Sequence, residues 1–253
     1  MFEARISSSY GKKQVLRDVK FCLPEGVIAL LGRNGSGKST LLHCIAGALP
    51  FEGSVKLDGK ELRGLPAREK AKLLSILPQM LPSPDLPAEE VVGFGRSPYS
   101  ARLSAKEREE VHAAMQKLGI GELATRRVST LSGGEKQKVF LAMLLVQDTP
   151  LVLLDEPTTY MDLPFKSVFF SVLQELKAKN KTVLFVSHDL SDGIFASDHV
   201  LVLEEGGIRF AGSREECLKG CVLERAFGAA RYEVEGNILF RYCGGGGTLC
   251  RRP

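Results

Sequence analysis

A glycine-rich segment with one lysine and two hydroxyl residues, GRNGSGKST, spans residues 32–40. It follows the apolar run VIALL (27–31) and opens the helix-like stretch STLLHCIAG, so it matches GxxxxGK[ST] in spelling and in context. Backbone N–H groups of such a loop curl around phosphate oxygens, and the helix N-terminus adds positive potential. Lys38 is expected to reach the β and γ phosphates, and Ser39 to ligate Mg²⁺. The expected nucleotide contacts are Gly32, Asn34, Gly35, Ser36, Gly37, Lys38, Ser39 and Thr40.

A second chemical signal is LVLLDEP, residues 151–157, in which four apolar residues lead into two acids. A buried strand that ends in carboxylates delivers them to the edge of the sheet where ligands bind. We expect Asp155 to hold Mg²⁺ through water and Glu156 to polarise the attacking water as a general base. The alternative is a strand with an ordinary acidic turn, and the phosphate-binding loop argues against it.

The segment LSGGEKQK, residues 131–138, places Ser132 and two glycines before the apolar stretch VFLAMLLV. By itself this pattern indicates only a helix N-cap with flexible glycines.

These motifs require a sheet to position them. VIALL, LVLL (151–154) and TVLFV (182–186) are short apolar runs separated by helical stretches, a pattern typical of a parallel α/β sheet. Residues 2–7 and 18–23 alternate as half-buried antiparallel strands do, with Val19, Phe21 and Leu23 on one face. The sequence therefore predicts an α/β fold with a mixed sheet.

A helical insertion interrupts this pattern between residues 83 and 136. No β-rich run occurs there, and residues 104–119 place Val111, Met115 and Leu118 at helical spacing. Ser104 with Glu107 predicts a capping box, and Gly119 a helix stop. Beyond about residue 213 only short fragments are predicted, and the Gly244–Gly247 run is expected to be mobile.

Composition narrows the class of protein. Thirty-four Lys and Arg residues against 30 Asp and Glu give a net charge of +4, spread along the chain, which is weak support for nucleic-acid binding. The apolar runs are shorter than a membrane span, and no secretory signal precedes them, so a cytosolic location is expected. The six cysteines are expected to be reduced, with Cys22 and Cys44 buried; metal or redox roles for Cys217 with Cys221 and for Cys243 with Cys250 remain alternatives.

Residues 1–210 resemble an ABC ATPase, because the motifs GRNGSGKST, LSGGE and LVLLDEP occur in the order and at the spacings of that family. The resemblance implies a single domain over residues 1–253, with a RecA-like P-loop NTPase core in 1–82 and 137–228. It also implies an antiparallel β subdomain, an inserted helical subdomain in 83–136, and a short tail in 229–253. In that family two subunits pair head to tail and sandwich each ATP.

The same resemblance assigns further roles. Ser132, Gly133 and Gly134 would bind the γ-phosphate of the partner subunit's ATP, as a helix N-terminus can. The remaining assignments are Tyr10 to adenine stacking, Gln79 to Mg²⁺ and to relaying its state, His188 to the γ-phosphate and the catalytic geometry, and Asp162 to the loop at the dimer interface. Two departures are Glu135, where many relatives have Gln, and Met143, where many have Arg.

The kind of ABC protein follows from chain organisation. Lys38 and Ser132 lie too close in sequence for the coiled-coil class of DNA-repair relatives. A single unfused cassette is similar to the importer arrangement, and VVGFGRSPY (91–99) and DEPTTYMDL (155–163) resemble the iron-chelate, haem and vitamin B12 group. The implied partners are a second copy, a polytopic membrane permease and, indirectly, a substrate-binding protein, at the cytoplasmic face of the cell membrane and without nucleic acid. An exporter subunit or a non-transport ATPase is the alternative.

Overall fold

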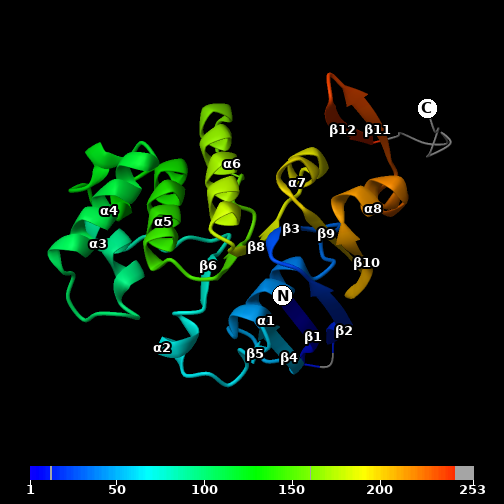
Figure 1. Ribbon diagram of the computed structural model, residues 1–253, viewed down its shortest axis with the longest axis horizontal. Helices are drawn as coiled ribbons and strands as arrows, with labels where there is room; N and C mark the ends of the chain where they lie inside the picture. Colours follow the sequence, from blue (N-terminus) through cyan, green and yellow to red (C-terminus); the bar gives the residue numbers. More distant parts are fainter. Residues whose placement is uncertain (12, 160, 243–253) are drawn as a thin grey trace. The chain divides into compact units, whose positions relative to one another are not determined.

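The computed structural model describes residues 1–11, 13–159 and 161–242 (Figure 1). The chain divides into two compact units: a first unit of Met1–Arg63 with Leu176–Pro253, and a second unit of Gly64–Glu175. Strands and helices alternate in both units, so the predicted α/β class is confirmed. The Gly244–Gly247 run, Cys243 and Cys250 lie outside the described residues.

An antiparallel sheet forms the start of the first unit. Its strands are β1 (Phe2–Tyr10), β2 (Lys13–Leu23), β4 (Glu52–Leu57) and β5 (Lys60–Glu61), in the order β2-β1-β4-β5. The inward face carries Val19, Phe21 and Leu23, as the alternation predicted, and the rings of Phe2 and Phe21 meet edge to face at 5.3 Å. Burying each such side chain contributes about 1.5–3 kcal/mol.

The strands that position the phosphate-binding loop are also in the first unit. β3 (Gly26–Leu31) lies parallel to β8 (Thr182–Val186) and to β9 (His199–Glu204), and β10 (Gly207–Ser213) pairs antiparallel with β9. Every residue of β3 and β8 is buried, as expected where helices cover both faces of a sheet. The carboxyl ends of β3, β8 and β9 therefore lie at one edge. The prediction of a mixed sheet is confirmed.

Helices and a hairpin complete the described part of this unit. The helices are α1 (Lys38–Ala46), α7 (Leu190–Ala196), α8 (Arg214–Lys219) and α9 (Val222–Phe227). The hairpin pairs β11 (Ala229–Val234) with β12 (Asn237–Tyr242), and β12 contacts α7. The backbone N–H of Phe240 donates to the Ser191 hydroxyl at 3.2 Å, which ties the hairpin to the start of α7.

The second unit combines a pair of parallel strands with several helices. β6 (Leu74–Leu77) pairs with β7 (Leu151–Leu154). The α-helices are α2 (Ala67–Lys70), α3 (Ala88–Gly93), α4 (Ala105–Lys117), α5 (Gly133–Gln147) and α6 (Leu163–Ala178), the last of which ends in the first unit. Short 3₁₀ turns occupy Phe94–Arg96, Gly121–Leu123 and Val128–Thr130.

The predicted helix at residues 104–119 is confirmed as α4. Ser104 and Glu107 form the expected capping box, and the backbone of Gly119 adopts a φ of +65° just beyond the helix. Val111, Met115 and Leu118 are buried. The spacing of apolar residues and the two end signals thus fixed this element correctly.

Two of the cysteine expectations are wrong. Cys22 is exposed, with its thiol 3.3 Å from the sulfur of Met1, because it lies on the face of β2 opposite Val19, Phe21 and Leu23. Cys221 is disulfide-bonded rather than reduced. Cys44 is buried as expected, and burial raises its pKa; Cys217 is likewise a buried free thiol, with its pKa raised to about 12 by burial.

Within the described residues, no helix combines the length and the apolar character that crossing a membrane would require.

Candidate functional site

The phosphate-binding loop leaves β3 and turns directly into α1. Gly35 and Gly37 have φ values of +76° and +103°, which L side chains rarely adopt, and a Cβ on Gly37 would lie 2.9 Å from Leu16 Cδ2. Gly37 is also the N-cap residue, so no side chain caps α1. The first turn of this helix therefore presents backbone N–H groups and the positive end of the helix dipole to an anion.

The side chains of the loop are arranged for a phosphate group. Lys38 is only 5% exposed, and its ammonium donates to the carbonyl oxygens of Gly32 at 2.8 Å and Arg33 at 3.1 Å. The hydroxyl of Ser36 is buried and meets no hydrogen-bond partner among the described residues. A buried polar group of this kind requires an explanation, and a bound anion supplies one.

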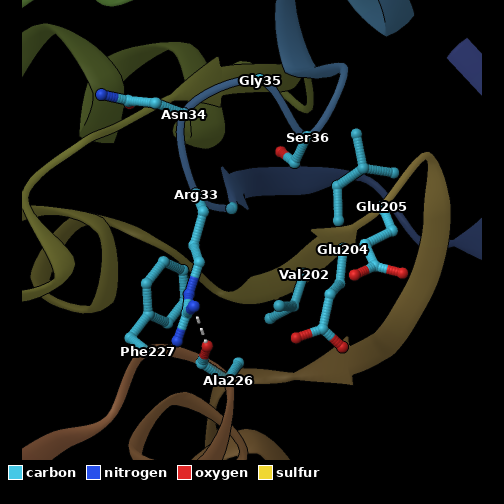
Figure 2. A pocket seen from close by; sticks show the side chains of 11 residues that line it. Arg33, Asn34, Gly35, Ser36, Val202, Glu204, Glu205, Ala226 and Phe227 are labelled. Carbon is cyan, nitrogen blue, oxygen red and sulfur yellow. Dashed lines mark hydrogen bonds between the residues drawn. The ribbon is translucent and has the colours of Figure 1, made fainter.

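A cavity of about 200 Å³ lies beside this loop, and Figure 2 shows its lining. Besides the loop it is lined by the end of β9, including Glu204 and Glu205, and by Ala226 and Phe227 at the end of α9. Arg33 reaches across it and donates from Nε to the Ala226 carbonyl oxygen at 3.1 Å (Figure 2). The negative charges of these two glutamates would repel a phosphate group, so this side of the cavity is unsuitable for phosphate. The expected place for phosphate therefore remains the N–H groups of the loop rather than this cavity.

His188 lies at the same edge of the sheet as the loop. It follows β8, and the N–H of the preceding Ser187 donates to the Leu30 carbonyl oxygen at 3.3 Å. Asp189 caps α7 by accepting the N–H groups of Ser191 at 2.8 Å and Asp192 at 3.0 Å. A cavity of about 150 Å³ here is lined by His188 to Ser191 and by Ala229 and Phe240. Contact with the C-terminal hairpin was not predicted, because nothing in residues 229–242 signalled its partner.

The second unit brings Gln79 and Glu156 together. The amide Nε2 of Gln79 donates to Glu156 Oε2 at 2.7 Å, although 77 positions separate the two residues. Glu156 follows the buried strand β7 and has a φ of +52°, which is rare outside glycine. Asp155, directly before it, is 2% exposed, and its N–H donates to the Leu77 carbonyl oxygen at 2.9 Å.

Ser132 caps α5 in the second unit. Its hydroxyl accepts the Glu135 N–H at 3.3 Å, and both its hydroxyl and its own N–H donate to Glu135 Oε2 at 2.8 Å. The N–H of Ser132 is the main reason why the pKa of Glu135 is lowered, followed by the Ser132 hydroxyl. Gly133 and Gly134 form the first turn of α5. A helix N-terminus with an exposed cap residue is thus present where the sequence predicted one.

The remaining predicted residues occupy separate places. Asp162 accepts the Phe165 N–H at 2.9 Å and so caps α6. Tyr10 lies at the end of β1 and is 53% exposed. Its role in adenine stacking stays a prediction.

One contact of the segment LSGGEKQK (131–138) was not predicted from the sequence. Gln137 is 5% exposed, and its amide Nε2 donates to the carbonyl oxygen of Pro157, next to Glu156. The available signal was a glutamine immediately before the apolar stretch of α5, since a polar residue on the buried face of a helix needs a partner.

The fold and these sites define a nucleotide-binding cassette. A solved dimer of the ATP-binding cassette MJ0796, described as a post-hydrolysis state bound to ADP and Pi, superposes with a TM-score of 0.75 over 85% of this chain and 99% of the other, at 24% identity. That likeness establishes the fold.

Sequence comparison establishes the family. The model of the ABC transporter family matches residues 16–159. The ferric enterobactin transport ATP-binding protein FepC of Escherichia coli (strain K12) is 36% identical over 231 residues, covering 88% of this chain and 85% of that protein. The hemin import ATP-binding protein HmuV of Pseudomonas entomophila (strain L48) is 36% identical over 226 residues, covering 86% and 88%. The chain belongs to the ABC transporter family, in which subunits of this kind hydrolyse ATP.

Proposed function

We propose that this chain is the ATP-hydrolysing subunit of an importer for a ferric siderophore, haem or a related metal chelate. The likeness to FepC and HmuV over most of the chain is the observation that carries the proposal, because both are ATP-binding proteins of such importers. The motif VVGFGRSPY (91–99) supports the same group. The chain would then lie on the cytoplasmic face of the membrane, held there by its permease.

The binding of ATP would use the loop after β3. The backbone N–H groups at the start of α1 would bind the phosphates, together with the buried hydroxyl of Ser36. Lys38 would exchange the carbonyl oxygens of Gly32 and Arg33 for the β and γ phosphates. Asn34, Gly35, Gly37, Ser39 and Thr40 belong to the same loop and helix start.

Mg²⁺ fits the donors that these motifs supply. Ser39 offers a hydroxyl, Gln79 an amide oxygen and Asp155 a buried carboxylate, all of which are oxygen ligands. Nowhere in the described ranges do three or more His, Cys, Asp and Glu side chains gather as metal ligands. Mg²⁺ is usually held by one or two carboxylates together with substrate phosphates and water. The ion would neutralise charge on the β and γ phosphates.

Hydrolysis would depend on Glu156. Its carboxylate would orient and polarise the attacking water, and Gln79 would hold that carboxylate in place. His188 would contact the γ-phosphate. Ser132, Gly133 and Gly134 would bind the γ-phosphate of the ATP held by a second copy of the chain, with Asp162 near the interface. The dimeric cassette MJ0796 supports a pairing of this kind.

Two experiments test the proposal. The purified wild-type chain and Lys38→Ala are compared for ATP turnover with Mg²⁺, with circular dichroism as the control for folding. Loss of turnover with an unchanged spectrum is expected, and unchanged turnover would refute the assignment of the loop. Tagged protein is then isolated from its native membrane, and the complex is reconstituted with labelled ferric siderophore, haem or cobalamin. ATP-dependent uptake of none of them, or the absence of a copurifying polytopic protein, would favour a non-transport ATPase.

A further inference from the structure

The turn that carries Glu156 is held at three separate points. The side chain of Glu156 accepts from Gln79 at 2.7 Å. Its own carbonyl oxygen accepts from Thr159, from the hydroxyl at 3.0 Å and from the N–H at 3.3 Å. The next carbonyl oxygen, that of Pro157, accepts from Gln137 Nε2. The uncommon φ of +52° at Glu156 therefore occurs in a turn that is held through the side chain of this residue and through the two carbonyl oxygens that follow its Cα atom.

The contact with Gln137 links this turn to the helix that begins after Ser132. Gln137 lies on α5, five positions after the N-cap residue Ser132, which is about 7.5 Å along a helix axis. The ammonium of its neighbour Lys138 lies over the ring of Phe165, 4.5 Å from the ring centroid. The start of α5 thus contacts the chain both directly after Glu156 and at the beginning of α6.

Gln137 also has a feature that packing alone does not explain. The residue is 5% exposed, and Oε1 of its amide meets no donor among the residues that the structure describes. A buried polar atom without a partner destabilises the fold, and leucine would fill a similar volume without this cost. The amide is therefore better explained by what its Nε2 holds than by stability.

We propose that Gln137 is a positioning residue for hydrolysis, which orients the Pro157–Thr158 peptide and, through this turn, the Glu156 carboxylate. The inference rests on the proposed role of Glu156 as the general base. Loss of the donor would let the Pro157 carbonyl oxygen rotate and would broaden the directions available to the carboxylate. Because the Gln137 amide acts on the turn after Glu156, the defect falls on turnover and spares the binding of ATP.

The chain offers a matched control on the same helix. Gln147, at the other end of α5, also donates from Nε2 to backbone carbonyl oxygens, those of Ala71 at 2.7 Å and Leu74 at 3.3 Å. Gln137→Leu removes a buried amide donor and Gln147→Leu a half-buried one, and both variants are measured in the full chain for kcat, KM and Tm. We expect kcat to fall roughly tenfold or more in Gln137→Leu, with KM within about twofold, since small misplacement of a catalytic group is costly. Gln147→Leu should keep the wild-type kcat.

A third variant separates positioning from packing. In Gln137→Glu the side chain can donate to the Pro157 carbonyl oxygen only when it is protonated, and burial raises the pKa of such a carboxyl. Its kcat, divided by that of the wild type, should rise as the pH is lowered from about 8 to about 6, within the range reached by buried carboxyl groups. A flat ratio, or a wild-type kcat in Gln137→Leu, would overturn the proposal. So would an equal loss of kcat in the two leucine variants.

Failure of the proposed function would give a different pattern of turnover in the variants. If Glu156→Gln hydrolyses ATP at the wild-type rate, Glu156 is not the base, and the proposed mechanism fails before Gln137 is considered. If Glu156→Gln is inactive while Gln137→Leu turns over normally, the mechanism stands and the positioning role alone is refuted.

Discussion

Gln79 and Glu156 are joined by a hydrogen bond of 2.7 Å from the side-chain amide to the carboxylate. The sequence assigned the first residue to the metal ion and the second to the attacking water, as separate roles. Because of this contact, a substitution at Gln79 should change the direction of the Glu156 carboxylate as well as the binding of any ligand to Gln79. Kinetic defects of Gln79 variants therefore report on both residues.

Glu156→Gln should bind ATP and fail to hydrolyse it. Glutamine keeps the size of the side chain and an oxygen that can accept from Gln79, and it removes the carboxylate that can polarise water. Turnover should fall at least about 100-fold, as for other losses of a general base. Unhydrolysed ATP should then favour the dimer by mass action, so light scattering after size exclusion should show about twice the monomer mass. Adding Ser132→Arg should return the protein to monomer; a dimer that persists would argue against a role for Ser132 at the interface.

Replacing Glu135 by Gln should strengthen that ATP-dependent dimer. The Glu135 carboxylate accepts both donors of Ser132, at 2.8 Å each, so its negative charge lies where a γ-phosphate is proposed to bind. Removing the charge in the Glu156→Gln background should lower the ATP concentration needed for dimerisation severalfold at low salt. The difference should shrink as ionic strength rises, because the Debye length falls from about 30 Å at 0.01 M to about 8 Å at 0.15 M. An effect independent of salt would point to altered helix capping instead.

Glu107 should make the helical region of the second unit sensitive to acid. Its pKa is lowered from 4.5 to about 2, mainly because it accepts the Ser104 N–H and then because of Arg96 and the Ser104 hydroxyl. A carboxyl group with a lower pKa in the folded state stabilises the fold above its unfolded pKa and loses that contribution as the pH falls through its folded pKa. The difference in urea midpoint between wild type and Glu107→Gln should therefore be constant above a pH of about 4.5 and shrink towards a pH of about 2. A difference that does not change over this range would contradict the prediction.

Met80 is a better probe of the proposed permease surface than Arg96. We expect this surface around Gln79 and in residues 82–99, where a proline-rich segment enters the helical insertion directly after a residue assigned to the nucleotide. Charge reversal at Arg96, within this segment, would be one test of it. The structure shows that the Arg96 side chain is only 20% exposed, pairs with Glu107 at 3.1 Å and donates to the Val146 carbonyl oxygen at 3.3 Å, so charge reversal would disrupt packing. Met80 is 88% exposed beside Gln79. Met80→Asp should reduce recovery of the permease complex and leave the basal ATPase of the isolated chain unchanged; equal loss of both would count against a docking role.

The sequence predicted most of the fold because its signals were local. The apolar runs at 27–31, 151–154 and 182–186 gave β3, β7 and β8, and Ser104 with Glu107 gave the start of α4. The error at Cys22 was avoidable, since the alternation that buried Val19 and Phe21 places residue 22 on the opposite face.

Contacts between residues far apart in the sequence could not be predicted from local signals. Gln79 and Glu156 are 77 positions apart, and Gln137 and Pro157 are 20 apart on different elements. These contacts depend on how α5, β6 and β7 pack together, which no local spacing encodes. Motifs identified the chemical groups of the candidate site, and packing decided which of them touch.

The bond between the Phe240 N–H and the Ser191 hydroxyl gives the chain a natural reporter. That N–H points away from β11, so its protection from solvent deuterium depends on the start of α7, three residues beyond His188. Any movement of the His188 segment on nucleotide binding should change the exchange rate of this amide while the cross-strand amides of the hairpin keep theirs. Mass spectrometry of the peptide that contains Phe240 could thus follow the state of His188 without a label.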